Sequence, residues 1–394
     1  MVSYPPLPNP KYMPNPDYRI CNRCVMDTSD PLITFDDQGV CSHCTTFDTS
    51  TSKFWYPNEH GAQLFQKRIE AIRAERRKHE YDCIIGLSGG IDSSYLALKI
   101  KEYDLRPLIV HVDAGWNSEL AVHNIERIVK HCNYDLHTHV IDWEVMRDLQ
   151  AAYLRAGVAN QDVPQDHAFF GALYHFAVKN NIRHVISGGN IATESVLPRA
   201  WGHNAMDAIN LKAIHRKHGT RSLGSFPVIN FFQYYFYYPF IRKMDVIRPL
   251  NYLPYRKDEA LKYLQETVGY RDYGRKHGES VFTRFFQNHY LPYKFGYDKR
   301  RAHLSSRILS GDIDRATALA ALEEPLYDEQ ELRQDKAYIA KKLGFSAEEF
   351  EQLLQPPGRV YTDYANQDGL YAAVRAGMRA VSALTGGRKV RVYS

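Results

Sequence analysis

The sequence has no apolar run long enough to cross a membrane. Its most apolar stretch, FFQYYFYYPFI at 231–241, is far shorter than the roughly 20 residues of a membrane helix, so we expect core or interface there. The first twenty residues lack the apolar segment of a secretion signal and are rich in proline. We therefore expect an extended arm over 1–20 and a soluble, cytoplasmic protein.

Cysteine is scarce, with six in 394 residues, and its placement is uneven. Four of the six stand in two CxxC pairs, CNRC at 21–24 and CSHC at 41–44. In a reducing compartment such pairs are typical of a structural four-thiolate zinc site. The segment has too little apolar material to fold without a metal. We predict a zinc ribbon over 21–58, with His43 as a bystander and with the ligands Cys21, Cys24, Cys41 and Cys44.

Strong charge of one sign is also missing, because the formal net charge is only +5. Such a charge permits an anionic ligand without requiring nucleic acid, and it also fits an ordinary solvated surface. The chain is too long for one ordinary core. We expect an α/β domain over 59–244 and a helical C-terminal domain over 245–394, after the arm and the ribbon.

Strand-like and helical patterns alternate in the middle of the chain, after a charged connecting helix at 59–80. This alternation predicts a parallel sheet with helices on both faces, and beyond 245 we expect no further strand. The strands are expected at 82–87, 107–112, 136–141 and 183–187, and the helices at 93–103, 117–131, 144–156 and 166–180.

The stretch SGGIDSS at 88–94 follows the first predicted strand and precedes a helix. Glycines let a backbone approach a phosphate closely, and the amino end of a helix attracts anions. The loop lacks the GK[ST] ending of a Walker motif. It resembles the pyrophosphate loop of the PP-loop ATP pyrophosphatases, which split ATP between the α and β phosphates. The resemblance implies an ATP and Mg²⁺ site formed by Ser88, Gly89, Gly90, Asp92, Ser93 and Ser94.

Two further loops end predicted strands and should meet the first, because ligands bind at the carboxyl ends of parallel strands. They are HVDAGW at 111–116 and SGGNIATES at 187–195. His111 is either a nucleotide contact or a strand residue, and the second glycine pair either admits the nucleotide or only turns the chain. The candidate nucleotide contacts are Val112, Asp113, Gly188, Gly189 and Asn190.

Taken with CNRCVMDTSDP, GVCSHC, LPRAW and HGESVFTRFFQNHYLPYKFGYDKRRAHLSSRI, these motifs resemble the N-acetyl sugar amidotransferase family between about residues 20 and 311. The resemblance implies an ATP-dependent, AMP-forming enzyme of bacterial surface polysaccharide and nonulosonic acid synthesis. It would convert the acetamido group of a sugar nucleotide into an acetamidino group through an adenylylated imidate. The candidate catalytic residues are Ser88, Asp92, Glu194, Lys299 and Arg300.

A glutaminase cysteine is missing, because Cys83 falls within a strand and Cys132 at the end of a helix. The resemblance implies a separate glutaminase and a barrel-type ammonia channel. We expect the partner to dock on 231–241 or on the ribbon, although core packing also explains the aromatic run. Neither a nucleic acid nor a membrane is expected as a partner.

A basic group in the C-terminal part is the candidate grip on the substrate diphosphate, because the arginine fork binds two oxygens at once. Solvated surface is the alternative for each member. The group comprises Arg275, Lys276, Arg284, Lys294, Lys299, Arg300 and Arg301. The nearby His277, Glu279, His289 and His303 match no standard metal-ligand spacing.

Two other functions compete with this interpretation. A tRNA-thiolating PP-loop enzyme also combines a zinc ribbon with this loop, but it generally needs additional cysteines near the nucleotide. A non-catalytic zinc-ribbon adapter or nucleic-acid-binding protein is the second, and the intact SGGIDSS argues against it. Filter binding at physiological salt discriminates this last class.

Overall fold

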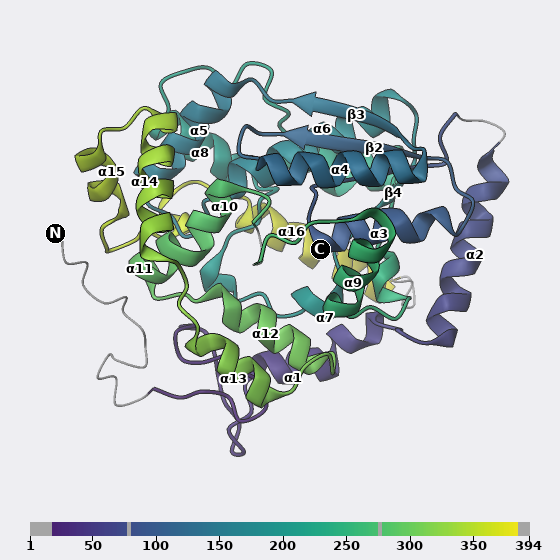
Figure 1. Cartoon of the computed structure of the whole chain (residues 1–394), viewed down its shortest axis with the longest axis horizontal. Helices are drawn as coiled ribbons and strands as arrows, with labels where there is room; N and C mark the ends of the chain where they lie inside the picture. The colour runs from purple at the N-terminus through teal and green to yellow at the C-terminus, as the bar shows by residue number, and fades with distance from the viewer. Residues whose placement is uncertain (1–17, 77–79, 275–277, 385–394) are drawn as a thin grey trace.

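The computed structural model describes residues 18–76, 80–274 and 278–384, so most of the predicted arm lies outside the described residues. Figure 1 shows a central sheet flanked by helices, with the N-terminal ribbon beside α12 and α13. The helices are α1 Ser42–Thr49, α2 Glu59–Glu75, α3 Ile91–Lys101, α4 Glu119–Cys132, α5 Trp143–Ala156, α6 Val163–Lys179, α7 Ile191–Glu194, α8 Ala208–His218, α9 Lys257–Val268, α10 Val281–Phe285, α11 Leu291–Phe295, α12 Lys299–Leu309, α13 Arg315–Glu323, α14 Glu329–Leu343, α15 Ala347–Leu354 and α16 Asp368–Leu384.

The sheet is parallel throughout and has the order β3-β2-β1-β4-β5. Its connections run outward from β1 in one direction and then restart on the other side with β4, so the topology switches between β1 and β4. Ligands of open α/β sheets bind at such a point. The strands are β1 Cys83–Gly86, β2 Pro107–Asp113, β3 Asp135–Val140, β4 His184–Ile186 and β5 Asp245–Ile247.

Both faces of the central strands are buried, which explains why these strands read as continuous apolar runs. Successive side chains point to opposite faces: Ile84 and Val110 join the core that contains α5 and α6, whereas Ile85 and Ile109 join the core that contains α2, α3 and α4. The predicted fold class, a parallel α/β sheet with a four-cysteine ribbon before it and helices after it, is confirmed.

The edge strand β5 corrects the expectation that no strand follows residue 245. It has only three residues, Asp245–Ile247, and pairs in parallel with β4, His184 lying opposite Asp245. A segment this short, between Lys243 and Arg248, is too brief to display a strand period. The pairing with β4 therefore determines its conformation, and the local sequence does not.

The aromatic run forms a π-helix at Gln233–Ile241 that is only partly buried. Tyr235 and Tyr238 are buried, whereas Phe232 and Phe240 are exposed. Core packing therefore accounts for only part of the aromatic run. Docking of a partner on the run stays a prediction. Within the described ranges, no helix combines the length and the apolar character needed to span a bilayer.

Candidate active site

The first loop, residues 88–94, turns tightly from β1 into α3 at the switch point. Gly89 has a φ of +86°, which favours glycine, and Gly90 is the N-cap of α3. The hydroxyl oxygens of Ser88 and Ser93 lie 3.1 Å apart. The Oγ of Ser94 is buried and finds no hydrogen-bond partner in the described part of the chain. Hydroxyls and backbone N–H groups at a helix amino end form an anion-binding site.

Three tyrosines brace this loop, and the sequence prediction missed all of them. The hydroxyls of Tyr270 and Tyr273 donate to the Gly89 carbonyl at 2.8 and 3.0 Å, and the Tyr255 hydroxyl donates to Oδ1 of Asp92. Burial raises the pKa of Tyr273 to about 12, so it stays a donor at neutral pH. No local motif marks these residues, because they lie far along the chain from the loop.

The second loop, residues 111–118, is held by its own polar side chains. Nδ1 of the buried His111 donates to the Leu87 carbonyl at 2.9 Å, which leaves Nε2 to accept from Asn117 Nδ2 at 3.0 Å. Oδ1 of Asp113 accepts from the Gly115 N–H at 2.7 Å. His111 therefore ties β2 to the end of β1, which favours its strand role, and Asp113 holds the loop in shape.

The segment 279–281 hydrogen-bonds to the second loop and brings Glu279 to the first loop. The Ser118 N–H donates to the Glu279 carbonyl at 2.8 Å, and the Val281 N–H donates to the Trp116 carbonyl at 3.2 Å. A Cβ on Gly90 would lie 3.4 Å from Oε1 of Glu279. The Glu279 carboxylate thus lies beside the amino end of α3.

The third loop, residues 187–196, packs directly on the first. A Cβ on Gly188 would lie 3.0 Å from the backbone nitrogen of Ser93, so only glycine fits there comfortably. Asn190 caps α7 by accepting from the Thr193 N–H at 2.9 Å, and Val112 is buried in the neighbouring strand. The predicted loops therefore converge at one end of the sheet.

Two charged side chains flank the glycine pair of the third loop. A Cβ on Gly189 would lie 3.7 Å from Nε of Arg248 and 3.9 Å from Oε2 of Glu194. Glu194 was predicted as catalytic. Arg248 was not, because it follows β5, the strand that the sequence did not reveal. An arginine beside a phosphate-type loop suits recognition of an anion.

An acidic group gathers near these loops, on one face of α6. Oδ1 of Asp162 accepts from Gln165 Nε2 at 3.0 Å and from Thr283 Oγ1 at 3.1 Å, and burial raises the pKa of Asp162 to about 6. Asp166 follows one helical turn later. Its surface is open to solvent, yet the surrounding protein, with the charges of Asp162 and Glu194, raises the pKa of Asp166 to about 7.

Lys299 is the predicted basic residue that faces this acidic group. Its positive charge lowers the pKa of both Asp162 and Asp166, against the larger effect of burial. Among the described residues it makes no ion pair, and its ammonium lies 5.8 Å from the centre of the Phe286 ring. The side chains of Lys299 and Asp166 are therefore both available to a ligand.

The other described members of the predicted basic group bind protein groups in this structure, and their assignment as a diphosphate grip stays a prediction. Arg300 donates to Asp298 and to carbonyls of α13, and its catalytic role stays a prediction. The remaining members bind carboxylates or carbonyls of other helices or of the ribbon: Arg284 with Asp335, Lys294 with the Leu353 carbonyl, and Arg301 with Asp27. Arg275, Lys276 and His277 lie outside the described residues.

The four ribbon cysteines converge, as predicted, and their spacing fits a tetrahedral metal. Their sulfurs lie within 4.8 Å of one another, and three of the sulfur–sulfur distances are 3.6 to 3.8 Å. Zn–S bonds of about 2.3 Å give a sulfur–sulfur edge of about 3.8 Å in a tetrahedron. His43 instead contacts Asp30 at 2.8 Å, which suits a bystander. The donor set thus fits Zn²⁺.

Replacing Cys21 with serine is expected to release the metal and unfold the ribbon, because this segment has little core of its own. Metal analysis should give less than one zinc per chain, and limited proteolysis should cut within residues 20–49. Cys132→Ser, at the end of α4, is the control and should retain zinc. A Cys21→Ser protein with full zinc content and wild-type proteolysis would contradict the assignment.

Comparison with known families bears on the C-terminal part. Residues 279–378 match the family model described as "LPS biosynthesis protein WbpG-like, C-terminal domain". This part of the chain is WbpG-like. Over these residues the match confirms the predicted resemblance to a family of surface-polysaccharide synthesis. The WbpG-like segment begins at Glu279, the residue that reaches Gly90, so it contributes directly to the site.

Similar solved structures include three synthetases, all at low identity. An NH₃-dependent NAD synthetase from Campylobacter jejuni is 13% identical, over 72% of this chain and 96% of that chain, with a TM-score of 0.31. An NMN synthetase from Francisella tularensis is 14% identical, over 73% and 97%, with a TM-score of 0.35. An NAD⁺ synthetase from Burkholderia pseudomallei is 17% identical, over 74% and 97%, with a TM-score of 0.32. A comparison with curated protein sequences gave no match.

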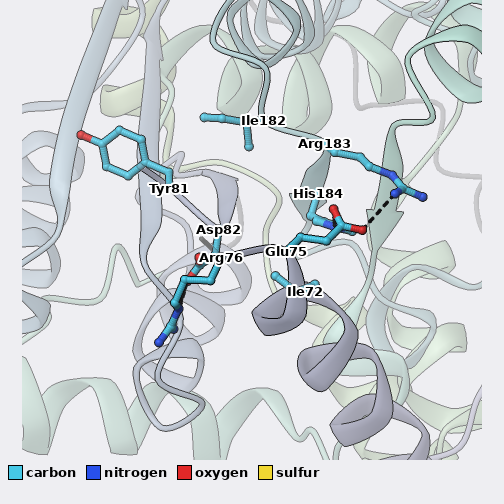
Figure 2. Close-up of a pocket in the computed structure, with 8 residues that line it drawn as sticks. All are labelled: Ile72, Glu75, Arg76, Tyr81, Asp82, Ile182, Arg183 and His184. Carbon is cyan, nitrogen blue, oxygen red and sulfur yellow. Dashed lines mark hydrogen bonds and ion pairs between the residues drawn. The ribbon is translucent and has the colours of Figure 1, made fainter. Parts of the chain in front are cut away.

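A pocket also lies at the opposite, amino-terminal ends of β1 and β4. Glu75 pairs with Arg183 at 3.1 Å and with His184 at 3.5 Å, which ties α2 to β4. Because ligands of parallel sheets bind at the other end, we give this pocket a structural role. Figure 2 shows its lining residues, Ile72, Glu75, Arg76, Tyr81, Asp82, Ile182, Arg183 and His184.

Proposed function

We propose that this protein is an ATP-dependent, AMP-forming amidotransferase of bacterial surface polysaccharide synthesis. Its substrate would be a sugar nucleotide whose acetamido group becomes an acetamidino group. One observation carries the proposal: a complete SGGIDSS loop at the switch point is joined, through Glu279, to a WbpG-like segment. The loop supports phosphate chemistry, and the segment supports a polysaccharide substrate.

The first loop would hold ATP, and Asp92 would hold Mg²⁺. ATP supplies an AMP group that turns the unreactive amide oxygen into a leaving group. In that step the amide oxygen bonds to the α phosphorus and pyrophosphate departs. The hydroxyls of Ser88 and Ser93, the amino end of α3 and Arg248 provide the positive environment for the charge that develops.

The acidic group would handle protons in the second step. Ammonia adds to the imidate carbon, AMP leaves, and the nitrogen gives up a proton to form the amidine. Asp166 suits the proton acceptor, because its side chain makes no hydrogen bond among the described residues and a base with a pKa near 7 is efficient at neutral pH. Lys299 suits stabilisation of the departing phosphate.

The nitrogen would come from a separate glutaminase through a barrel-type partner. Both cysteines outside the ribbon are buried, and burial raises the pKa of the Cys83 thiol and raises that of Cys132 to about 11. Such thiols are poor nucleophiles at neutral pH, which supports a glutaminase site on another chain.

The test is to incubate the protein with ATP, ammonium and a panel of acetamido sugar nucleotides. We expect AMP and pyrophosphate to form in equal amounts only with an accepted sugar, together with an amidine product seen by mass spectrometry. Glutamine as the sole nitrogen source should give no amidine until a glutaminase–barrel pair is added. ADP and phosphate as products, or glutamine-dependent turnover by this chain alone, would overturn the proposal.

A further inference from the structure

The helix α12 forms a buried polar contact with the ribbon. Oγ of Ser305 accepts from the Val25 N–H at 3.2 Å. Arg301 donates from Nη1 to the Val25 carbonyl at 2.9 Å and pairs through Nε with Asp27 at 2.9 Å. Arg301, Ser305 and Asp27 are all less than one-tenth exposed. Because buried polar groups are costly to leave unpaired, α12 and the first cysteine pair are held in one arrangement.

A second anchor joins the ribbon to the next helix. Arg315 of α13 donates to the backbone carbonyls of Cys21 at 2.9 Å and Cys24 at 3.0 Å. These carbonyls belong to two of the four thiolate residues, so the path of the first cysteine pair is set partly from outside the ribbon. Figure 1 shows α12 and α13 side by side against the ribbon.

Helix α12 and the residue after it also hydrogen-bond to the third loop. Oγ of Ser306 accepts from the Val196 N–H at 3.0 Å, Nδ1 of His303 lies 3.3 Å from the Thr193 carbonyl, and Oγ of Ser310 donates to the Ala192 carbonyl at 3.0 Å. These bonds fix α7, which carries Glu194. Neighbouring residues of a helix point in different directions, so Ser305 serves the ribbon and Ser306 serves the loop.

Apolar packing also connects the ribbon, the third loop and α12. The four cysteines share one buried cluster with Val196 and Trp201, which follow α7, and with Ala302 and Leu309 of α12. The ribbon therefore has no separate core. Loss of its metal would loosen a cluster to which the third loop also belongs.

We propose that the four-cysteine ribbon positions the third loop through α12, with Ser306 as a positioning residue that holds the end of this loop. A metal-filled ribbon holds α12, and α12 holds α7 and the glycine pair in the geometry that receives a nucleotide. The inference rests on the proposed function only in naming a nucleotide as the ligand of the third loop. The coupling itself is a property of the folded chain.

The test uses hydrogen exchange of the full chain, with and without zinc removal by a chelator. We expect chelation to increase exchange in residues 191–196 as well as in the ribbon. Ser306→Ala should increase exchange in 191–196 while zinc stays at one per chain, and Ser306→Thr, which keeps the hydroxyl, should restore protection. Ser346→Ala, which removes an exposed N-cap hydroxyl of α15 that also accepts from a backbone N–H, is the control and should leave 191–196 unchanged.

Kinetics add a second readout. Ser306→Ala should raise KM for ATP by about fivefold, the effect of one lost hydrogen bond, with a smaller change in kcat. Unchanged exchange in 191–196 on chelation, while the ribbon itself exchanges freely, would overturn the coupling. Exchange needs neither ATP nor sugar, so absence of amidotransferase activity would count against the proposed function and leave this inference standing.

Discussion

Replacing Asp92 with asparagine is expected to stop the formation of AMP and pyrophosphate, with kcat falling by about 10²–10³-fold or more. Asp92 stands in the first turn of α3, and Tyr255 binds only its Oδ1. Among the described residues its second oxygen has no partner, which leaves it available to a magnesium ion. Asparagine keeps the shape and the tyrosine bond but removes the charge that the metal requires.

Comparison with Tyr255→Phe separates the effect of the Asp92 charge from the effect of its hydrogen bond. Phenylalanine removes the brace on Asp92 and keeps the carboxylate, so we expect a smaller loss of rate. Ser88→Ala should also stop pyrophosphate formation, because it removes a hydroxyl from the same loop. Circular dichroism and melting temperature check that each variant is folded. A folded Asp92→Asn protein with wild-type pyrophosphate release would refute the assignment.

Replacing Asp166 with asparagine is expected to lower the rate with ammonium by about 10²-fold or more at pH 8, the usual contribution of a general base. The wild-type carboxyl has a pKa of about 7, so its advantage should shrink as the pH falls through 7. The measurement is the ratio of wild-type to variant rates between pH 5.5 and 8.5. The ratio cancels the titration of ammonium itself. A constant ratio would show that Asp166 is not the base.

The same substitution should change stability in a defined direction. The pKa of Asp166 is raised in the folded protein, from an unfolded value of about 3.9 to about 7. Its contribution to folding is therefore complete below about pH 4 and is lost as the pH rises through 7. Asp166→Asn should melt slightly above wild type at pH 8, by a small margin because solvent screens this exposed side chain, and the difference should vanish near pH 4. Equal melting temperatures at pH 8 would contradict the raised pKa.

Sequence reasoning succeeded where a local pattern determines a local structure. The cysteine pairs, the SGGIDSS turn and the alternation of strands and helices all carry their geometry in neighbouring residues, and the structure places Cys83 in β1 and Cys132 at the end of α4 as predicted. The convergence of the loops followed from the parallel sheet alone.

The residues that surround the loops could not be predicted, because long-range packing supplies them. Tyr270 lies 181 residues from Gly89, and Tyr255 lies 163 residues from Asp92. The protein partners of the basic group could not be predicted either. Composition reveals a positive charge but not its partner, and Arg284 finds Asp335 on another helix.

The bonds from Arg315 to the first cysteine pair have a consequence for the newly made chain. They span 294 residues to Cys21 and 291 to Cys24. At about 5–20 residues per second, a ribosome needs about 15–60 seconds between making the ribbon and making the arginine that anchors it. During most of that interval the anchors from α12 and α13 are not yet made, and the ribbon thiols are open to oxidation. Early capture of zinc would protect them, so zinc starvation during synthesis should reduce the yield of folded protein more than zinc removal afterwards does.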